Sequence, residues 1–134
     1  MASNLKYSNG TRDAQQNGLI TYAGTGAIIS IYTGTQPATA NTALSGNTKL
    51  VDLVISGSFG TDSNGTLTFS TVSNGTAVAT GTATFFRITQ SNGTTVVMDG
   101  SVGTSGADMN ISSTSISTGQ TVSITSGTIV RGNQ

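Results

Sequence analysis

Five aspartates are the only acidic side chains of this sequence, and they limit the chemistry that the chain could perform. His, Cys and Glu are absent from the 134 residues. A Ser-His-Asp arrangement is therefore impossible, and a zinc site lacks its usual ligands. Hydrolysis by paired carboxylates would use Asp99 and Asp108, which flank a loop expected over 100–107. We interpret each of them instead as an acceptor of backbone N–H groups in a turn, and we expect no catalytic residue and no enzyme.

Two further segments share features with ligand-binding loops but lack the residues that bind. Asp62-Ser-Asn-Gly65 is rich in oxygen atoms, yet it is too short for an EF-hand loop and has no terminal glutamate. Gly100, Gly103 and Gly106 are spaced like a phosphate loop, but neither the lysine nor a following helix pattern is present. We interpret the first as an Asx-turn and the second as a glycine-permitted turn between strands. The sequence predicts no metal and no cofactor.

The sequence leaves two possible roles open for the tyrosines and two for one arginine. Tyr7, Tyr22 and Tyr32 could form a platform that stacks on sugars. The simpler interpretation places Tyr22 and Tyr32 in the core or at an interface, with the hydroxyl in water. Arg87 lies in the most apolar strand-like run, where it either donates to an interfacial ion pair or lays its stem along the sheet with its head in water.

Charge is sparse and balanced. Five Lys and Arg residues oppose the five aspartates, which gives a formal net charge of zero. The basic residues are scattered, so we expect neither nucleic-acid binding nor a basic membrane-binding surface. No apolar run approaches the roughly 20 residues of a membrane helix. The first residues show no secretory signal, so we expect synthesis in a cytoplasm. A hydrophobic content of 34% without Trp suggests that association supplies part of the stability.

The first 25 residues differ in pattern from the rest. Ser8 or Asn9 could cap a short helix from about Thr11 to Tyr22, with Asp13 in its first turn. Its weakly apolar face would contain Ala14, Gly18 and Tyr22, beside Leu19 and Ile20. The alternative is an extended arm with one helical turn. We divide the chain into an N-terminal arm or short helix at 1–25 and a β-sandwich domain at 26–134.

From residue 27 the apolar pattern has a period of two, which is typical of strands. Thr, Ser and Gly account for 61 of the 134 residues. Asn-Gly begins at 9, 17, 64, 74 and 92, and between alternating runs this dipeptide indicates a hairpin. Strands are expected at 28–32, 49–56, 65–71, 76–90 with a break at Gly81, 94–102, 108–112 and 120–131, with a loop at 34–46. Short strands with closely spaced turns predict an all-β fold, an antiparallel β-sandwich or a jelly-roll-like barrel.

Four strings of the sequence resemble small structural proteins of tailed bacteriophages, often encoded in the head gene region. The resemblance runs in order from about residue 5 to 132. The strings are Leu5-Lys-Tyr-Ser8 with Arg12-Asp-Ala14, Ile31-Tyr-Thr-Gly-Thr-Gln-Pro-Ala38, Ala83-Thr-Phe-Phe-Arg-Ile-Thr89 with Gly93-Thr94, and Gly100-Ser-Val-Gly-Thr-Ser-Gly-Ala-Asp-Met-Asn110.

This resemblance implies a virion component of the head decoration or cement type. Such a protein would bind the major capsid protein as a homotrimer on the capsid surface and stabilise the phage head. The resemblance carries over no active-site residue. Because its composition differs, the segment from 1 to about 25 would then be an arm that contacts the capsid. The alternatives are a tail or neck subunit of the virion and a carbohydrate-binding adhesive module.

Overall fold

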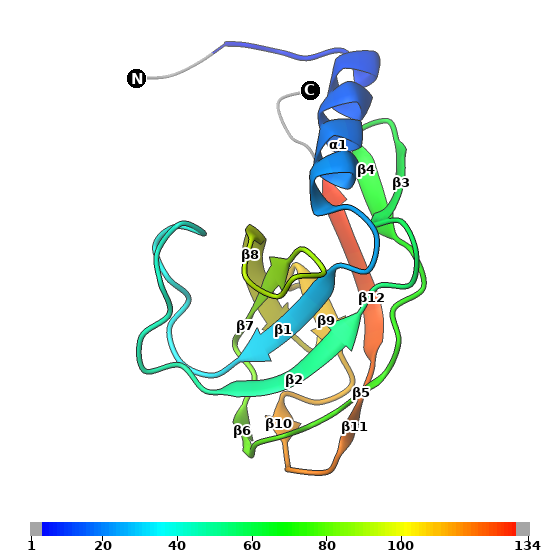
Figure 1. The fold of residues 1–134 in the computed structure, drawn as a ribbon. Helices are drawn as coiled ribbons and strands as arrows, with labels where there is room; N and C mark the ends of the chain where they lie inside the picture. The colour runs from blue at the N-terminus through cyan, green and yellow to red at the C-terminus, as the bar shows by residue number, and fades with distance from the viewer. Residues whose placement is uncertain (1–3, 131–134) are drawn as a thin grey trace.

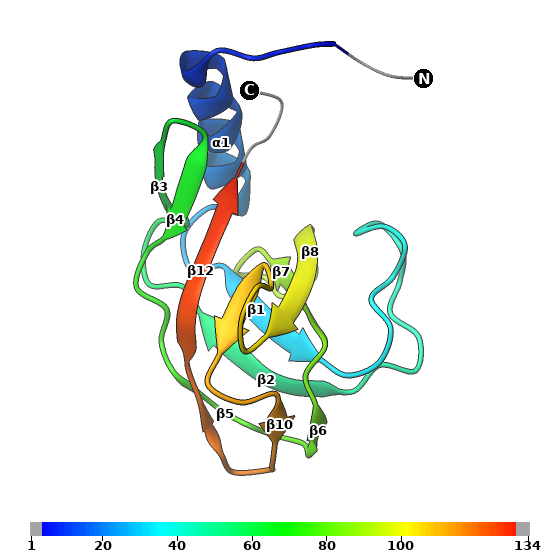
Figure 2. The same cartoon turned by 180° about the vertical axis from the view of Figure 1, so that it is seen from behind.

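The chain folds into a curled β-sheet with one helix against its end (Figures 1 and 2). This computed structural model describes residues 4–130, with side chains to residue 125. Its elements are α1 (Asn9–Ala23), β1 (Ile28–Tyr32), β2 (Lys49–Val54), β3 (Gly60–Ser63), β4 (Thr66–Phe69), β5 (Gly75–Thr76), β6 (Gly81–Thr82), β7 (Phe85–Thr89), β8 (Val96–Gly103), β9 (Met109–Ile111), β10 (Ser115–Ile116), β11 (Thr121–Val122) and β12 (Ile124–Val130). The prediction of an all-β fold with a short N-terminal helix is confirmed.

Eight strands form one sheet in the order β2-β1-β7-β8-β9-β12-β4-β3. Two small pairs, β10 with β6 and β11 with β5, continue it at the lower end in Figure 1. Neighbours in the large sheet are antiparallel, except that β8 and β9 are parallel, with Val102 opposite Met109. Parallel strands usually need a crossover of a dozen or more residues. Here the short turn at 104–108 is sufficient, because only the ends of the two strands pair.

The outer edge of β2 is covered by the segment that follows β4. The amide of Ser73 donates to the carbonyl of Val54 (2.9 Å), and the amide of Val78 donates to the carbonyl of Leu50 (2.8 Å). β4 itself pairs with β12 near the other end of the sheet. The segment 70–78 therefore links the two ends of the sheet, and the sheet curls around its inner face (Figures 1 and 2).

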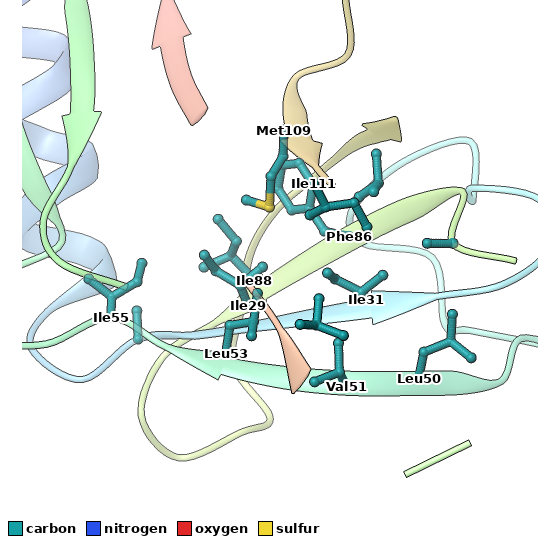
Figure 3. Close-up of a cluster of buried hydrophobic side chains, with 14 of the residues drawn as sticks. Ile29, Ile31, Leu50, Val51, Leu53, Ile55, Phe86, Ile88, Met109 and Ile111 are labelled. Carbon is teal, nitrogen blue, oxygen red and sulfur yellow. The ribbon is translucent and has the colours of Figure 1, made fainter. Parts of the chain in front are cut away.

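The hydrophobic core lies on that inner face (Figure 3). In the register of β1 with β7, Ile29 pairs with Ile88 and Ile31 pairs with Phe86. The labelled side chains come from β1, β2, β7 and β9, with Ile55 just after β2, and they point toward one another: Ile29, Ile31, Leu50, Val51, Leu53, Ile55, Phe86, Ile88, Met109 and Ile111. Apart from Leu50, which lies at a register shift between β1 and β2, these core residues alternate along their strands because successive side chains point to opposite faces of a sheet. Burial itself does not alternate in β7, where both faces are covered.

Helix α1 begins at Asn9, two residues before the expected start. Ser8 is the capping residue, and its hydroxyl accepts the amide of Thr11 (3.2 Å). The earlier start moves Asp13 out of the first turn, so the predicted interaction with the helix dipole is wrong. Asp13 instead accepts the amide of Gly65 (2.6 Å), in the hairpin that joins β3 to β4.

The predicted apolar face of the helix is only partly buried. Leu19 and Ile20 are half-buried and pack against the core, whereas Ala14, Gly18 and Tyr22 face solvent. Arg12 and Gln16 are buried, with 4% and 2% of their surface exposed. The Gln16 amide donates to the carbonyl of Gly65 (2.8 Å). The guanidinium of Arg12 lies so close to Gly65 that a Cβ there would stand 2.6 Å from Arg12 Cζ. Polar contacts with a glycine turn therefore orient this helix, and a hydrophobic pattern does not detect them.

Two of the five Asn-Gly pairs form turns between strands. Asn64 and Gly65 have φ of 52° and 81°, and they join β3 to β4 as the left-handed pair that a tight hairpin requires. Asn92 and Gly93 turn the chain from β7 to β8, where Asn92 Oδ1 accepts the amides at 94 and 95. The pairs at 9 and 17 lie inside α1, and Gly75 lies in β5, so these three do not form the hairpins that the dipeptide indicates.

Several strand boundaries differ from expectation. The run 76–90 is broken into β5, β6 and β7, and the break at Gly81 is itself the start of β6. The run 120–131 is divided into β11 and β12, and Arg131 lies outside the described residues. The expected strands include neither β3 nor β10. β3 is short and polar and pairs with β4 in a tight hairpin, whereas β10 is short and takes its pairing from the distant β6.

Two glycine substitutions test this packing in opposite directions. A Cβ at Gly75 would stand 2.3 Å from the carbonyl oxygen of Asp52, whereas a Cβ at Gly18 would meet nothing within 4 Å. We expect Gly75→Ala to lower the free energy of unfolding by about 1–3 kcal/mol, because β5 must move away from β2. Gly18→Ala should raise it by about 0.5–1 kcal/mol through helix propensity. Urea denaturation measures both, and a stable Gly75→Ala protein would contradict the closure of the sheet.

Candidate functional site around Arg87

A row of polar side chains crosses the outer face of four strands. Ser30 of β1 is paired with Asp52 of β2 on one side and with Arg87 of β7 on the other. Arg87 is paired in turn with Asp99 of β8. These residues alternate with the core residues of the same strands, so they lie on the opposite face. The sheet thus aligns two carboxylates, a hydroxyl and a guanidinium in one line, which we call the polar row.

Arg87 and Asp99 form the buried ion pair of this row. Arg87 Nε donates to Asp99 Oδ1 (2.7 Å), and Nη2 donates to Oδ2 (2.8 Å). The side chains are only 7% and 4% exposed. The hydrogen bond to Asp99 raises the pKa of Arg87, against the opposite effect of burial, and the charge of Asp99 raises it further. Of the two alternatives for Arg87, the structure has the ion pair, formed within the chain.

Sequence reasoning missed Asp99 as the partner of Arg87. A turn centred on Asn92-Gly93 would place Arg87 opposite Met98. The register of β7 with β8 shifts by one residue between 88 and 89, and this shift brings Arg87 opposite Asp99. The turn alone therefore does not predict the pair.

A third hydrogen bond of Arg87 reaches the loop that joins β1 to β2. Its Nη2 also donates to the main-chain carbonyl of Thr42 (2.9 Å). This loop, residues 33–48, is the cyan segment that arches beside β7 and β8 in Figures 1 and 2. Phe85 and Thr89 flank Arg87 on the outer face of β7 and are 0% and 6% exposed. The outer face of β7 is therefore covered, and Thr42 bonds to its central residue.

The base of loop 33–48 is held by side chains on both of its arms. Asn47 Nδ2 donates to the carbonyls of Thr33 (2.8 Å) and Thr35 (3.2 Å). Thr84, just before β7, donates its hydroxyl to the carbonyl of Gly34 (2.6 Å). Gly34 has φ of 82°, and a Cβ there would stand 2.9 Å from Asn47 Nδ2. Loop 33–48 is therefore fixed at its base by Asn47 and Thr84 and at its middle by Arg87.

The other end of the polar row is exposed. Ser30 donates its hydroxyl to Asp52 Oδ1 (2.5 Å), and Lys49 Nζ contacts Asp52 Oδ2 at 2.9 Å, with both charged side chains more than two-fifths exposed. The hydrogen bond to Asp52 raises the pKa of Lys49 above its ordinary 10.5. Because a raised pKa favours the protonated lysine in the folded chain, the pair stabilises the fold below pH 10.5 and ceases to do so as the pH rises through the higher folded-state pKa. Because both side chains are exposed, the Lys49–Asp52 pair contributes little to the free energy of unfolding.

The tyrosines do not form a sugar platform. Tyr32 stacks on Phe85 with ring centroids 5.5 Å apart and planes 18° apart, beside the polar row. Tyr7 precedes α1, whereas Tyr22 lies near its other end and is 54% exposed. The core or interface role expected for Tyr32 agrees with its contact with Phe85, while Tyr22 lies outside the core.

The two aspartates considered for hydrolysis have separate partners. Asp99 binds Arg87, so its expected role as a turn acceptor is wrong. Asp108 accepts the amide of Ser101 (2.9 Å) and the hydroxyl of Ser101 (3.1 Å), and its own amide donates to that hydroxyl (3.1 Å). This reciprocal contact closes the turn between β8 and β9, as expected for Asp108. Both carboxylates are thus engaged within the fold, Asp99 in the middle of β8 and Asp108 in the turn that follows it.

The remaining candidate segments are parts of strands and turns. Asp62 pairs with Leu67 in the β3–β4 hairpin, and its carboxylate lies 3.5 Å from Asn17 Nδ2 of α1, so the expected Asx-turn is wrong. Gly100 lies in β8 against the ring of Phe86, where a Cβ would stand 2.4 Å from Cζ. Gly103 ends β8, and Gly106, with φ of 69°, turns the chain toward β9, as expected.

Residues 4–130 hold neither a cluster of metal ligands nor a membrane-spanning helix. No group of three or more Asp side chains is placed to hold a metal ion in that part of the chain. Nor does any described helix have the length and apolarity needed to cross a membrane.

The two ion pairs of the polar row should differ sharply in their effect on stability. Arg87→Met leaves Asp99 buried without its partner, so we expect the free energy of unfolding to fall by about 3–5 kcal/mol. Lys49→Met removes an exposed pair and should cost about 1 kcal/mol or less. Urea denaturation of the two variants beside the parent chain provides the comparison. Equal, small losses would show that the Arg87–Asp99 pair is not buried as described.

Comparison of the chain with protein-family models, with curated proteins and with solved structures found no match. The resemblance to phage structural proteins rests on its four sequence strings. Three of these strings contribute residues to β1, β7 and the turn between β8 and β9. These residues are Tyr32, Phe85, Arg87 and Asp108.

Proposed function

We propose that the chain is a virion structural protein of a tailed bacteriophage, a head decoration or cement protein that binds the major capsid protein and stabilises the head. The observation that carries this proposal is the spatial arrangement of the resembling strings. Ile31–Ala38 includes the end of β1 and the start of loop 33–48, Ala83–Thr89 includes β7, and Gly100–Asn110 joins β8 to β9. β1, β7 and β8 are adjacent in the sheet, so three of the strings lie together in space. Two of them contain Gly34, Thr84 and Arg87, which take part in holding loop 33–48.

The character of the side chains supports a role in contact rather than in chemistry. Asp99 and Asp108 are each engaged within the fold, and the chain has neither His nor Cys. A neutral surface rich in Thr, Ser and Gly suits weak contacts that are repeated many times on a lattice, where avidity replaces strong single contacts.

Exposed apolar side chains support association with other chains. Leu5, Val54 and Val78 are 62%, 44% and 66% exposed. A symmetric assembly offers a place to bury such residues. We therefore propose a homotrimer on the outer surface of the capsid, assembled after synthesis in the host cytoplasm, with no nucleic-acid or membrane partner.

Heads that lack the protein provide the direct test. We expect purified protein to bind them saturably, to reach hundreds of copies for each particle, and to raise the temperature at which the heads release DNA. Electron microscopy of labelled virions should place the protein over the whole head. Absence of binding, or a few copies confined to the tail or neck, would contradict the decoration role.

A further inference from the structure

Loop 33–48 is exposed along most of its length. Of residues 34–46, only Pro37, Ala40 and Leu44 are half-buried, and the others face solvent. The loop contains no ionisable side chain and consists mainly of Thr, Ala, Gly, Ser and Asn. It thus presents main-chain N–H and C=O groups beside small, uncharged side chains.

The exposed loop is nevertheless anchored by one of the most buried polar groups in the described chain. A buried ion pair is often no more stabilising than apolar side chains of similar volume. Arg87 differs from an apolar residue in one respect that matters here, because it can donate to the carbonyl of Thr42 while it binds Asp99. The ion pair therefore fixes the guanidinium, and the guanidinium fixes the middle of the loop.

We propose that loop 33–48 is the surface that binds the capsid shell protein, and that Arg87 is a positioning residue that holds the loop in its binding conformation. This inference rests on the proposed function and adds to it the surface that makes the contact. A loop that is ordered before binding loses less conformational entropy when the complex forms. The resemblance implies that residues 1–25 contact the capsid. Helix α1 is a poorer candidate for that contact than loop 33–48, because Arg12 and Gln16 already contact Gly65 of the same chain.

The chemistry of the loop specifies the partner surface. A phosphate-bearing partner would require cations, and loop 33–48 has none. Small side chains and exposed main-chain groups fit an uncharged protein surface that offers hydrogen bonds. Binding through such a surface should be insensitive to salt, because screening acts on charged groups.

Three variants test the inference on heads that lack the protein. The double variant Arg87→Met with Asp99→Leu replaces the pair by apolar side chains and removes the donor to Thr42 without leaving a buried charge. The amides of Thr42 and Ser45, which donate within the loop, should exchange with solvent about tenfold faster or more, and the affinity of this variant for heads should fall about tenfold or more. Ser45→Arg places a large cation on the loop and should abolish binding. Ser58→Arg is the matched control, since Ser58 is also exposed but lies between β2 and β3.

The outcomes separate the two proposals. If the parent chain binds heads and Ser45→Arg binds equally well, loop 33–48 is not the contact surface, and the decoration role still stands. If the parent chain does not bind, the decoration role fails and this inference fails with it. If the double variant does not fold, the affinities of Ser45→Arg and Ser58→Arg for heads decide whether loop 33–48 is the contact surface. A loss of affinity of about tenfold or more between about 0.05 and 0.5 M salt would also overturn the inference.

Discussion

The buried pair of Arg87 and Asp99 is the interaction on which the outer half of this structure depends. It joins β7 to β8 across the sheet, and through the carbonyl of Thr42 it joins both strands to loop 33–48. Desolvation makes such a pair costly unless its remaining donors are satisfied. Because the loop supplies the acceptor for Nη2, the pair and the loop stabilise each other. The surface presented by loop 33–48 is therefore a consequence of a charge inside the protein.

Close approach at glycine is the second constraint, and it explains much of the composition. Gly75 allows β5 to lie against the main chain of β2, and Gly100 allows the ring of Phe86 to approach the main chain of β8. Threonine and serine supply strand propensity and hydroxyl donors in the rest of the sheet, as Thr84 and Ser30 illustrate. A chain with few aromatic residues can thus enclose a core, because the sheet curls tightly around it.

The sequence predicts the sheet better than it predicts the contacts on either side of it. Alternation predicts β1 at Ile28–Tyr32 with no error at either end, and it places Ile29 and Ile31 in the core. The face of α1 is predicted only in part. Leu19 and Ile20 pack against the core, but Asp13 and Gln16 bond to Gly65, and these polar contacts depend on a distant hairpin. The pairing of Asp99 with Arg87 depends on a register shift between 88 and 89 that the turn at 92–93 does not predict, and the bond to Thr42 is tertiary and has no local signal.

The exchange of the Arg87 Nε proton with water tests the central claim most directly. In the structure this proton lies in a hydrogen bond to Asp99, with both side chains almost fully buried. We predict a sharp guanidinium Nε–H resonance for Arg87 in the ¹⁵N NMR spectrum at neutral pH, with an exchange rate about a hundredfold or more below that of free arginine. Exchange as fast as in free arginine would contradict the buried pair, and with it the account of how loop 33–48 is held.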